Sequence, residues 1–212
     1  MHKVIDLKVL YFGTPVVLIG SRNADGSANL APVSSAWWLG HSCVLGLGNS
    51  TQSAVNLLRE GECVLNLPSS AMVDAVDRLA LLTGNPVVTD FKRQQGYRFE
   101  PRKFAAAGLT EQPGELVRAP RAAECPVQLE CRLAAATPLA GNERCTAFEV
   151  EVVRAHVDEA LIVPGTDHYV DPLGWDPLIM KFCEFFGDGR RLRPSRLAEG
   201  WQMPGRLAPA RA

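Results

Sequence analysis

The sequence predicts a mainly β protein with a few helices, arranged as a barrel with helical decoration. Short apolar, β-branched runs recur along the chain and are separated by turn residues at nearly regular spacing. Only two or three segments have the apolar periodicity of a helix. With 212 residues, the chain is long enough for one sizeable core and is not clearly divided into two.

The first strand is indicated by a β-branched run over residues 15–21 that ends at a turn. Asp25 and Gly26 form the Asp-Gly pair typical of a tight hairpin, because both residues tolerate a positive φ. We therefore expect a second strand over residues 27–38. A third strand is predicted over residues 43–48, where the run is again apolar.

A helix follows the third strand. Apolar residues between 54 and 58 lie on one helical face, and Asn49, Ser50 and Thr51 are candidate N-caps. Gly61 is placed to end this helix.

The middle of the chain is less regular. A strand is predicted over residues 63–67 and a second helix over residues 71–82, which Gly84 and Pro86 would stop. Residues 90–121 have no clear period, so we expect a long loop region with a short helical turn. A loop of this length in a compact domain points to function or to partner contact.

Two strands with alternating polarity come next, over residues 125–133 and 148–152, joined by a turn at residues 141–143. The alternation slips at residues 152–153, which predicts a bulge or a register change. A short further strand is predicted over residues 160–163.

The composition divides the chain and excludes several classes of function. We assign residues 1–187 to one domain and residues 188–212 to a tail rich in Arg, Pro and Ala, either disordered or lying as an arm on a partner subunit.

The net charge is -1 and the charges are interspersed, so we expect no nucleic-acid partner. No stretch approaches the roughly 18 apolar residues of a membrane span. Asp6 interrupts any signal peptide, so we expect a cytoplasmic protein.

Cysteines and histidines do not form a recognisable reactive or metal site. None of the six cysteines is paired as C-x-x-C, and most lie in apolar runs typical of small buried residues. The four histidines have no metal-ligand spacing. We therefore expect no bound metal.

The residues between the third strand and the first helix form a candidate anion site. Gly46 and Gly48 would let a ligand approach the backbone closely. Unpaired N–H groups at a helix N-terminus, beside hydroxyl and amide side chains, suit a phosphate. Simple capping of the helix by Ser50 or Thr51 is the alternative interpretation.

A second unusual segment lies inside the strand predicted over residues 27–38. Pro32 cannot donate to a β-ladder, so it implies an edge strand or a distortion. Ser34 and Ser35 follow it and would present hydroxyl and backbone groups. An edge strand with solvent-facing serines would explain the same residues without a ligand.

Together the two segments resemble the FMN-binding split barrel of the flavin reductase-like family. The matching residues are Gly26, Asn29, Ala31, Pro32, Ser34, Ser35, residues 45–48, Thr51, Asn56, Leu57 and residues 63–68. The likeness continues in residues 103–110 and 123–131 and covers most of residues 10–187. It implies a Greek-key split β-barrel and a homodimer with flavin near the subunit interface.

The resemblance also implies which residues bind FMN. The family's N-x-A-P-x-S segment lies along the isoalloxazine ring and the ribityl chain, and its polar loop and threonine hold the phosphate. The implied cofactor-binding residues are Asn29, Ala31, Pro32, Val33, Ser34, Ser35, Gly48, Asn49, Ser50, Thr51, Gln52 and Asn56.

One departure from the family pattern concerns charge. Many members carry a basic and an acidic residue just before the loop threonine, where this chain has Asn49 and Ser50. The phosphate charge must then be met by backbone dipoles, by Gln52 or by a basic residue elsewhere. Lys92 and Arg93, with Arg98 nearby, are candidates, although each residue also fits an ordinary solvated surface.

The leading hypothesis is hydride transfer from NADH or NADPH to bound FMN, which then reduces a small-molecule acceptor such as free flavin. It explains why no acid–base constellation is evident, because the flavin carries the chemistry. One alternative is an FMN oxidase or reductase of an organic substrate, resembling pyridoxamine-phosphate oxidase. Another is a non-enzymatic module that binds flavin or haem.

Overall fold

The computed structural model describes residues 1–193, 195 and 197. The strands of its main sheet are β2 (Val17–Arg22), β3 (Ala28–Val33), β4 (Ala36–Leu39), β5 (Ser42–Gly48), β6 (Glu62–Leu67), β11 (Val127–Leu139) and β12 (Asn142–Val157). The shorter strands are β1 (Phe12–Pro15), β7 (Leu82–Thr83), β8 (Arg98–Phe99), β9 (Glu111–Gln112), β10 (Arg121–Ala122), β13 (Ile179–Lys181) and β14 (Glu184–Phe186). The helices are α1 (Gln52–Glu60), α2 (Val73–Asp77), α3 (Asp90–Gln94) and α4 (Lys103–Ala107), with 3-10 turns at Ser70–Met72 and Glu159–Leu161.

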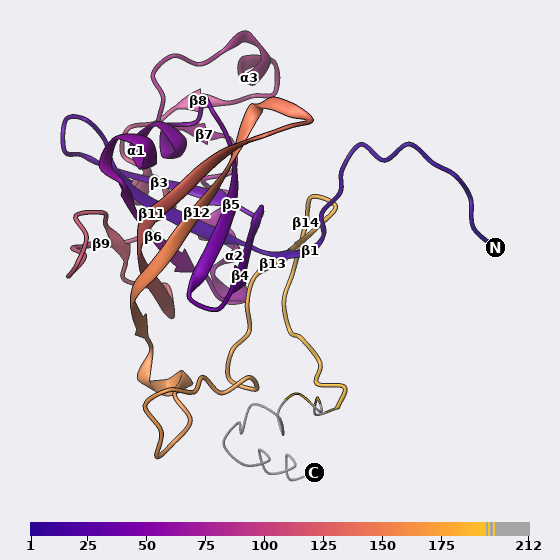
Figure 1. Cartoon of the computed structure of the whole chain (residues 1–212), viewed down its shortest axis with the longest axis vertical. Helices are drawn as coiled ribbons and strands as arrows, with labels where there is room; N and C mark the ends of the chain where they lie inside the picture. The colour runs from indigo at the N-terminus through magenta and orange to yellow at the C-terminus, as the bar shows by residue number, and fades with distance from the viewer. Residues whose placement is uncertain (194, 196, 198–212) are drawn as a thin grey trace.

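The main sheet is antiparallel, with the strand order β3-β2-β6-β11-β12-β5-β4. It curls so that its two ends approach each other, because only Ser34 and Ser35 separate β3 at one end of the order from β4 at the other. The N–H of Gly46 on β5 donates to the carbonyl of Ser35 at 2.8 Å and continues the β4–β5 ladder. In Figure 1 the long β11–β12 hairpin runs across the curled sheet, and α1 lies beside one end of it. The mainly β barrel expected from the sequence is confirmed.

Apolar side chains fill both faces of β2. Val17 and Ile19 pack inside the barrel with Leu45 and Phe148. Leu18 points the other way and packs in a second cluster with α2 and α4. A strand buried on both faces carries a continuous apolar run, which is why residues 15–21 gave so strong a signal.

The first helix forms as expected. Thr51 is the N-cap, and its side chain accepts a hydrogen bond from the N–H of Ala54. Gly61 follows the helix with φ 69°, a left-handed conformation that suits glycine. Ala54 and Leu57 are fully buried inside the barrel, so α1 closes one end of it.

The bulge predicted at residues 152–153 is confirmed. Cys131 pairs with Val152 while Glu130 pairs with Arg154, so Val153 has no direct partner on β11. Both strands of this hairpin extend further than predicted, because their outer halves continue the ladder with exposed side chains.

Three elements differ from the sequence predictions. The strand predicted over residues 27–38 breaks at Ser34 and Ser35, because the chain passes there from β3 to β4 at opposite ends of the sheet order. The helix predicted over residues 71–82 ends early, and its last residue begins β7 instead. In place of the strand predicted over residues 160–163, the structure has the end of a 3-10 turn at residues 160–161 and an isolated bridge at Ile162.

Residues 84–122 form an outer segment that is more structured than the predicted loop. It contains α3, α4 and three two-residue strands. In Figure 1, α3 lies at the far end of an excursion from β7 and β8. Of the tail, residues 194, 196 and 198–212 lie outside the described part, so its predicted role stays a prediction.

Candidate functional site

The break between β3 and β4 forms the first part of the site. Ala31, Pro32, Val33, Ser34 and Ser35 are all partly exposed. β3 is the edge strand of the main sheet, so the edge position predicted from Pro32 is confirmed. The break is thus partly accessible, although the Ser35 carbonyl accepts from Gly46 and the Ser35 hydroxyl lies 3.4 Å from that of Tyr11.

Gly46 joins this break to β5. A Cβ atom at Gly46 would lie 3.1 Å from the Cβ of Ser35, tighter than an ordinary contact. The absence of a side chain therefore lets the serine backbone come against β5. Gly48, two residues further on, precedes the turn into α1, and its own Cβ would meet only the Thr51 methyl group at 3.5 Å.

The first turn of α1 forms the second part. The N–H of Thr51 donates to the carbonyl of Gly48, and the N–H of Ala54 donates to the Thr51 hydroxyl. Among the described residues, the N–H groups of Gln52 and Ser53 have no acceptor, as expected at a helix start. Ser50 is exposed beside them. These groups are donors, and no carboxylate hydrogen-bonds to them, so they fit a phosphate.

Asn49 is held by β12. Its Nδ2 donates to the carbonyl of Glu143 at 3.0 Å, and its Oδ1 accepts from the hydroxyl of Thr146 at 2.8 Å. Both ends of this amide are therefore occupied within the protein. Asn49 fixes the loop against the β11–β12 hairpin.

Asn29 and Asn56 lie beneath the site in a buried polar network. They are 1% and 0% exposed, and the Nδ2 atoms of both donate to the hydroxyl of Ser21. Asn29 also donates to the hydroxyl of Ser53 on α1, and Gln52 donates to Oδ1 of Asn56 at 2.8 Å. A flavin contact by either asparagine stays a prediction; the structure places both where they anchor α1 to β2 and β3.

The segment around Gly84 covers this network, and the sequence carries no signal for that role. A Cβ at Gly84 would lie 2.3 Å from Oδ1 of Asn29, so only glycine fits there. Nδ2 of Asn85 donates to the carbonyl of Ser50 at 3.3 Å. Gly84 was interpreted only as a helix stop, and no periodic signal could have shown that it packs on residues more than thirty positions away.

Lys103 is a second residue whose role the sequence did not reveal. Its ammonium is buried and donates to the carbonyls of Leu30 on β3 and Leu82 on β7, at 3.1 and 3.0 Å. Burial lowers the pKa of Lys103 to about 8, and the nearby positive charge of Lys92 acts in the same direction. The side chain ties the outer segment to the edge strand that carries Pro32.

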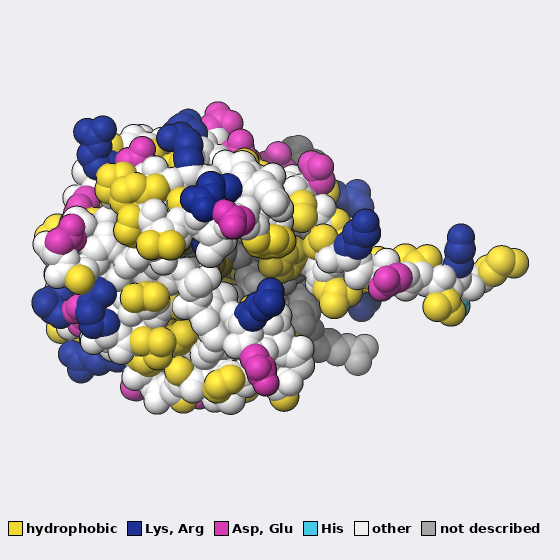
Figure 2. All heavy atoms as spheres, turned by 90° about the horizontal axis from the view of Figure 1, so that it is seen from above, with side chains coloured by type: hydrophobic (Ala, Val, Ile, Leu, Met, Phe, Trp, Pro, Cys, Tyr) yellow, Lys and Arg dark blue, Asp and Glu magenta, His cyan; other side chains and the backbone are white. Residues whose placement is uncertain are grey.

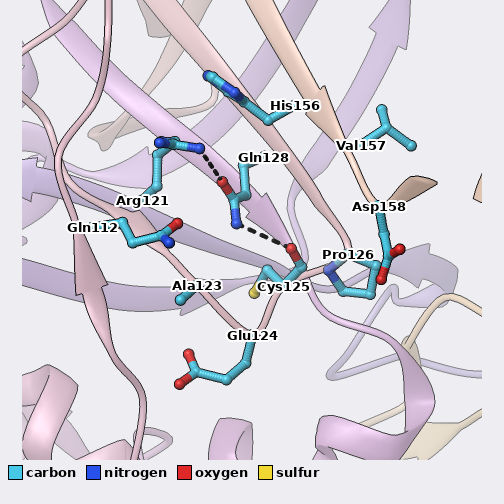
Figure 3. A pocket seen from close by; sticks show the side chains of 10 residues that line it. All are labelled: Gln112, Arg121, Ala123, Glu124, Cys125, Pro126, Gln128, His156, Val157 and Asp158. Carbon is cyan, nitrogen blue, oxygen red and sulfur yellow. Dashed lines mark hydrogen bonds between the residues drawn. The ribbon is translucent and has the colours of Figure 1, made fainter. Parts of the chain in front are cut away.

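A surface pocket of about 250 Å³ lies elsewhere, at the start of β11 and the end of β12. Figure 3 shows Arg121, Gln128 and His156 around it. Their polar atoms are bonded within the protein: Arg121 donates to Gln128 at 3.0 Å, and Nε2 of His156 lies 2.7 Å from Glu130. This pocket shares no residue with the break or the first turn of α1.

Other chemistries have little support in the part of the chain that is described. No group of three or more His, Cys, Asp or Glu residues there could hold a metal ion. All six cysteines are free, and burial raises the pKa of Cys43 and of Cys125 to about 12, so neither supplies a thiolate near neutral pH. No helix of the described residues is long and apolar enough to cross a bilayer.

The charges visible on the molecular surface are of both signs. Figure 2 shows lysine, arginine and acidic side chains interspersed on the face seen from above, with the N-terminal segment projecting to one side. This face has no basic stripe of the kind that nucleic acid would require.

The fold and the paired loops define a flavin-binding split barrel, and comparison with known proteins agrees. Residues 9–180 match the flavin reductase like domain, so the chain belongs to the flavin reductase-like family. It is 33% identical over 190 residues to the uncharacterised protein YdfE of Bacillus subtilis, covering 90% of this chain and 91% of that one.

Solved structures share the fold. Flavoredoxin of Desulfovibrio vulgaris superposes with a TM-score of 0.75 and 25% identity, over 94% of this chain and 100% of that one. Nitrilotriacetate monooxygenase component B of Bacillus cereus gives 0.70 and 21%, over 86% and 88%. Pseudomonas fluorescens 2-nitrobenzoate 2-nitroreductase gives 0.69 and 18%, over 89% and 86%. A flavin cofactor and an oxidoreductase class follow from the family.

Proposed function

We propose that this protein binds FMN and passes electrons from NADH or NADPH through the flavin to a small-molecule acceptor. One observation carries the proposal: the serine-bearing break after β3 and the donor-rich first turn of α1 meet the same short stretch of β5. Ser35 contacts that stretch at Gly46, and the turn into α1 begins at Gly48. A phosphorylated, elongated cofactor needs such a pair of neighbouring sites.

The chain's own residues supply binding and orientation. Ser50 and Thr51, with the N–H groups of Gln52 and Ser53, would hold the phosphate at the start of α1. The segment from Ala31 to Ser35 would border the ring and the ribityl chain. The flavin supplies hydride acceptance when it is bound, which is why no acid–base pair is required here.

We also propose a homodimer. Exposed apolar side chains support it: Trp37 and Leu39 on the edge strand β4 are 55% and 76% exposed. Phe12 on β1, a strand in contact with β4, forms an exposed edge-to-face pair with Phe182, with ring centres 4.8 Å apart. An edge strand with apolar side chains favours burial against another copy. Analytical sedimentation should give twice the mass of one chain, and a mass equal to one chain would contradict the proposed homodimer.

The test of the proposed function is an anaerobic absorbance experiment. The purified protein is loaded with FMN and mixed with NADH or NADPH, and the flavin absorbance is expected to bleach faster than that of free FMN. Failure to bind FMN in titration would overturn the proposal at its first step. Bleaching by dithionite but not by either nicotinamide would instead favour a flavin-binding electron carrier.

A further inference from the structure

The phosphate site proposed above is short of positive charge. Asn49 and Ser50 occupy the positions before Thr51, and both are neutral. Asn49 is also bound at both ends of its amide, to Glu143 and Thr146. Backbone dipoles at one helix start correspond to about half a positive charge, whereas FMN brings a phosphate with a charge of about −1.5 to −2. A cation from another element would complete the site.

The basic residues of the outer segment that the sequence offers as candidates, and the buried Lys103, have other contacts. Arg93 pairs with Asp90 at 2.7 Å, and Arg98 lies 4.0 Å from Glu100. Lys92 lies over the ring of Tyr97, and the ammonium of Lys103 is bound to two carbonyls.

The hairpin β11–β12 brings a different arginine to the loop. β12 pairs with β5 so that Cys145 is opposite Gly48 and Thr146 is opposite Leu47. The ladder continues for one more residue, because the N–H of Asn49 donates to the carbonyl of Arg144 at 2.9 Å. Arg144 is therefore directly opposite Asn49, two residues before Thr51.

The pairing also determines to which face of the sheet the Arg144 side chain projects. Directly opposite residues project to the same face of a sheet, and so do residues two apart. The hydrogen bond between Thr146 and Asn49 shows that these two side chains share a face, and Arg144 belongs to that set. Leu47 lies on the same face and packs in the barrel with Ala54 and Leu57 of α1. Arg144 thus projects on the side of β5 that carries the helix.

Arg144 is exposed, and among the described residues its guanidinium has no ion-pair partner. Residues opposite each other in an antiparallel pair have Cα atoms about 4.5 to 5.5 Å apart. The long arginine side chain can bridge such a separation to the turn that begins α1. Its planar donors match phosphate oxygens better than a point charge does.

We propose that Arg144 supplies the missing positive charge and makes the site select a phosphorylated flavin over riboflavin. The inference rests on the proposed function, since it concerns the same site. It assigns the charge to the β11–β12 hairpin, on the opposite side of β5 from the serine-bearing break. Replacing this arginine should therefore affect the phosphate and leave recognition of the ring unchanged.

The experiment measures dissociation constants for FMN and riboflavin by flavin fluorescence. In Arg144→Gln, FMN binding should weaken by about tenfold to a hundredfold, as for a lost charge-assisted hydrogen bond. Riboflavin binding should stay within about twofold, the scatter expected without a lost interaction. Arg144→Lys should keep part of the preference. Salt should weaken FMN binding to the natural protein more than to Arg144→Gln, because screening acts on the charge pair.

Arg132→Gln is the matched control, because Arg132 is an exposed arginine on the neighbouring strand β11 whose own contact is with the carbonyl of Leu116. It should leave both affinities unchanged. If Arg144→Gln and Arg132→Gln bind FMN equally well, the assignment to Arg144 is wrong while FMN binding itself stands. If the unaltered protein binds neither flavin, the proposed function fails first.

Discussion

The barrel and the outer segment of residues 84–122 are stabilised in different ways. The barrel strands bury alternating apolar side chains in continuous ladders, with Ile19, Leu65 and Phe148 all fully buried. The outer segment has few ladders of its own. It packs on the barrel through Phe104 and Ala107 of α4, and single polar side chains hold other parts of it. The carboxylate of Glu130 accepts N–H bonds from Glu115, Leu116 and Val117, and Oδ1 of Asn66 accepts from Ala122 at 2.7 Å.

The two regions therefore have different effects: one on the stability of the fold and the other on the geometry of the candidate site. The barrel determines whether the chain folds, because apolar burial dominates the free energy of folding. The outer segment determines how the site is covered, because Gly84 and Asn85 pack on the first turn of α1 and on its supporting network. Substitutions in the barrel should therefore mainly change the stability of the fold, whereas substitutions in the outer segment should mainly change how the site is covered.

The largest expected effect compares two barrel residues, Phe148 in the core and Glu130, whose carboxylate holds the outer segment. Phe148→Ala should lower the free energy of unfolding by about 3–5 kcal/mol, since it leaves a cavity in the barrel. Glu130→Gln keeps one acceptor oxygen but turns an amide donor toward at least one of the three N–H groups of residues 115–117, so it should cost about 1–3 kcal/mol. Urea unfolding measures both values.

Hydrogen exchange then locates each effect. In Glu130→Gln the amides of residues 115–117 should exchange faster while barrel amides stay protected, because the loss is local. In Phe148→Ala the exchange rates of the barrel amides should increase most. Uniform acceleration across both regions in Glu130→Gln would show that the outer segment and the barrel unfold as one unit.

A second prediction concerns pH and the buried lysine that joins the two regions. Burial lowers the pKa of Lys103 to about 8 from the 10.5 of an exposed lysine. Between these pH values the unfolded chain binds a proton that the folded protein lacks, so stability should rise with pH across this window. Each pKa unit corresponds to about 1.36 kcal/mol, which limits the gain to about 3 kcal/mol.

Lys103→Met removes the titrating group while keeping an unbranched side chain. The difference in unfolding free energy between the natural protein and this variant should grow in favour of the natural protein from about pH 8 to about pH 10.5. The other ionisable groups are the same in both proteins, so their contributions cancel in the comparison. A difference that stays constant with pH would mean that Lys103 is charged in the folded state throughout.

Much of the barrel could be predicted because its signals are local. The alternation of residues 148–152 and its slip at 152–153 gave the strand and the bulge, and the pattern from Thr51 to Gly61 gave both ends of α1. The break at Ser34 and Ser35 could not be derived, because it depends on how the curled sheet closes against Gly46. Pro32 indicated only that this strand is an edge strand or is distorted there.

Part of the candidate site could also be predicted, because two of its segments have local sequence patterns. The loop from Gly48 to Gln52 and the segment from Ala31 to Ser35 stand out in the sequence and are brought to the same strand. The contributions of Asn85, Lys103 and Arg144 depend on pairings between distant segments, and the chain carries no local pattern for them. A basic partner for the phosphate was expected in the outer segment, but Lys92, Arg93 and Arg98 have contacts of their own there, and Arg144 is the partner proposed here.

The smallest expected effect tests the two interpretations of Thr51. Its hydroxyl accepts the N–H of Ala54 at 3.3 Å, so Thr51→Ala should lower the unfolding free energy by about 1 kcal/mol through loss of the cap. If the hydroxyl also contacts the phosphate, FMN binding by the folded protein should weaken by about 1–3 kcal/mol. Thr51→Ser keeps the hydroxyl and should preserve both properties. A stability loss with an unchanged FMN dissociation constant would assign Thr51 to capping alone and leave the phosphate to the backbone N–H groups and Arg144.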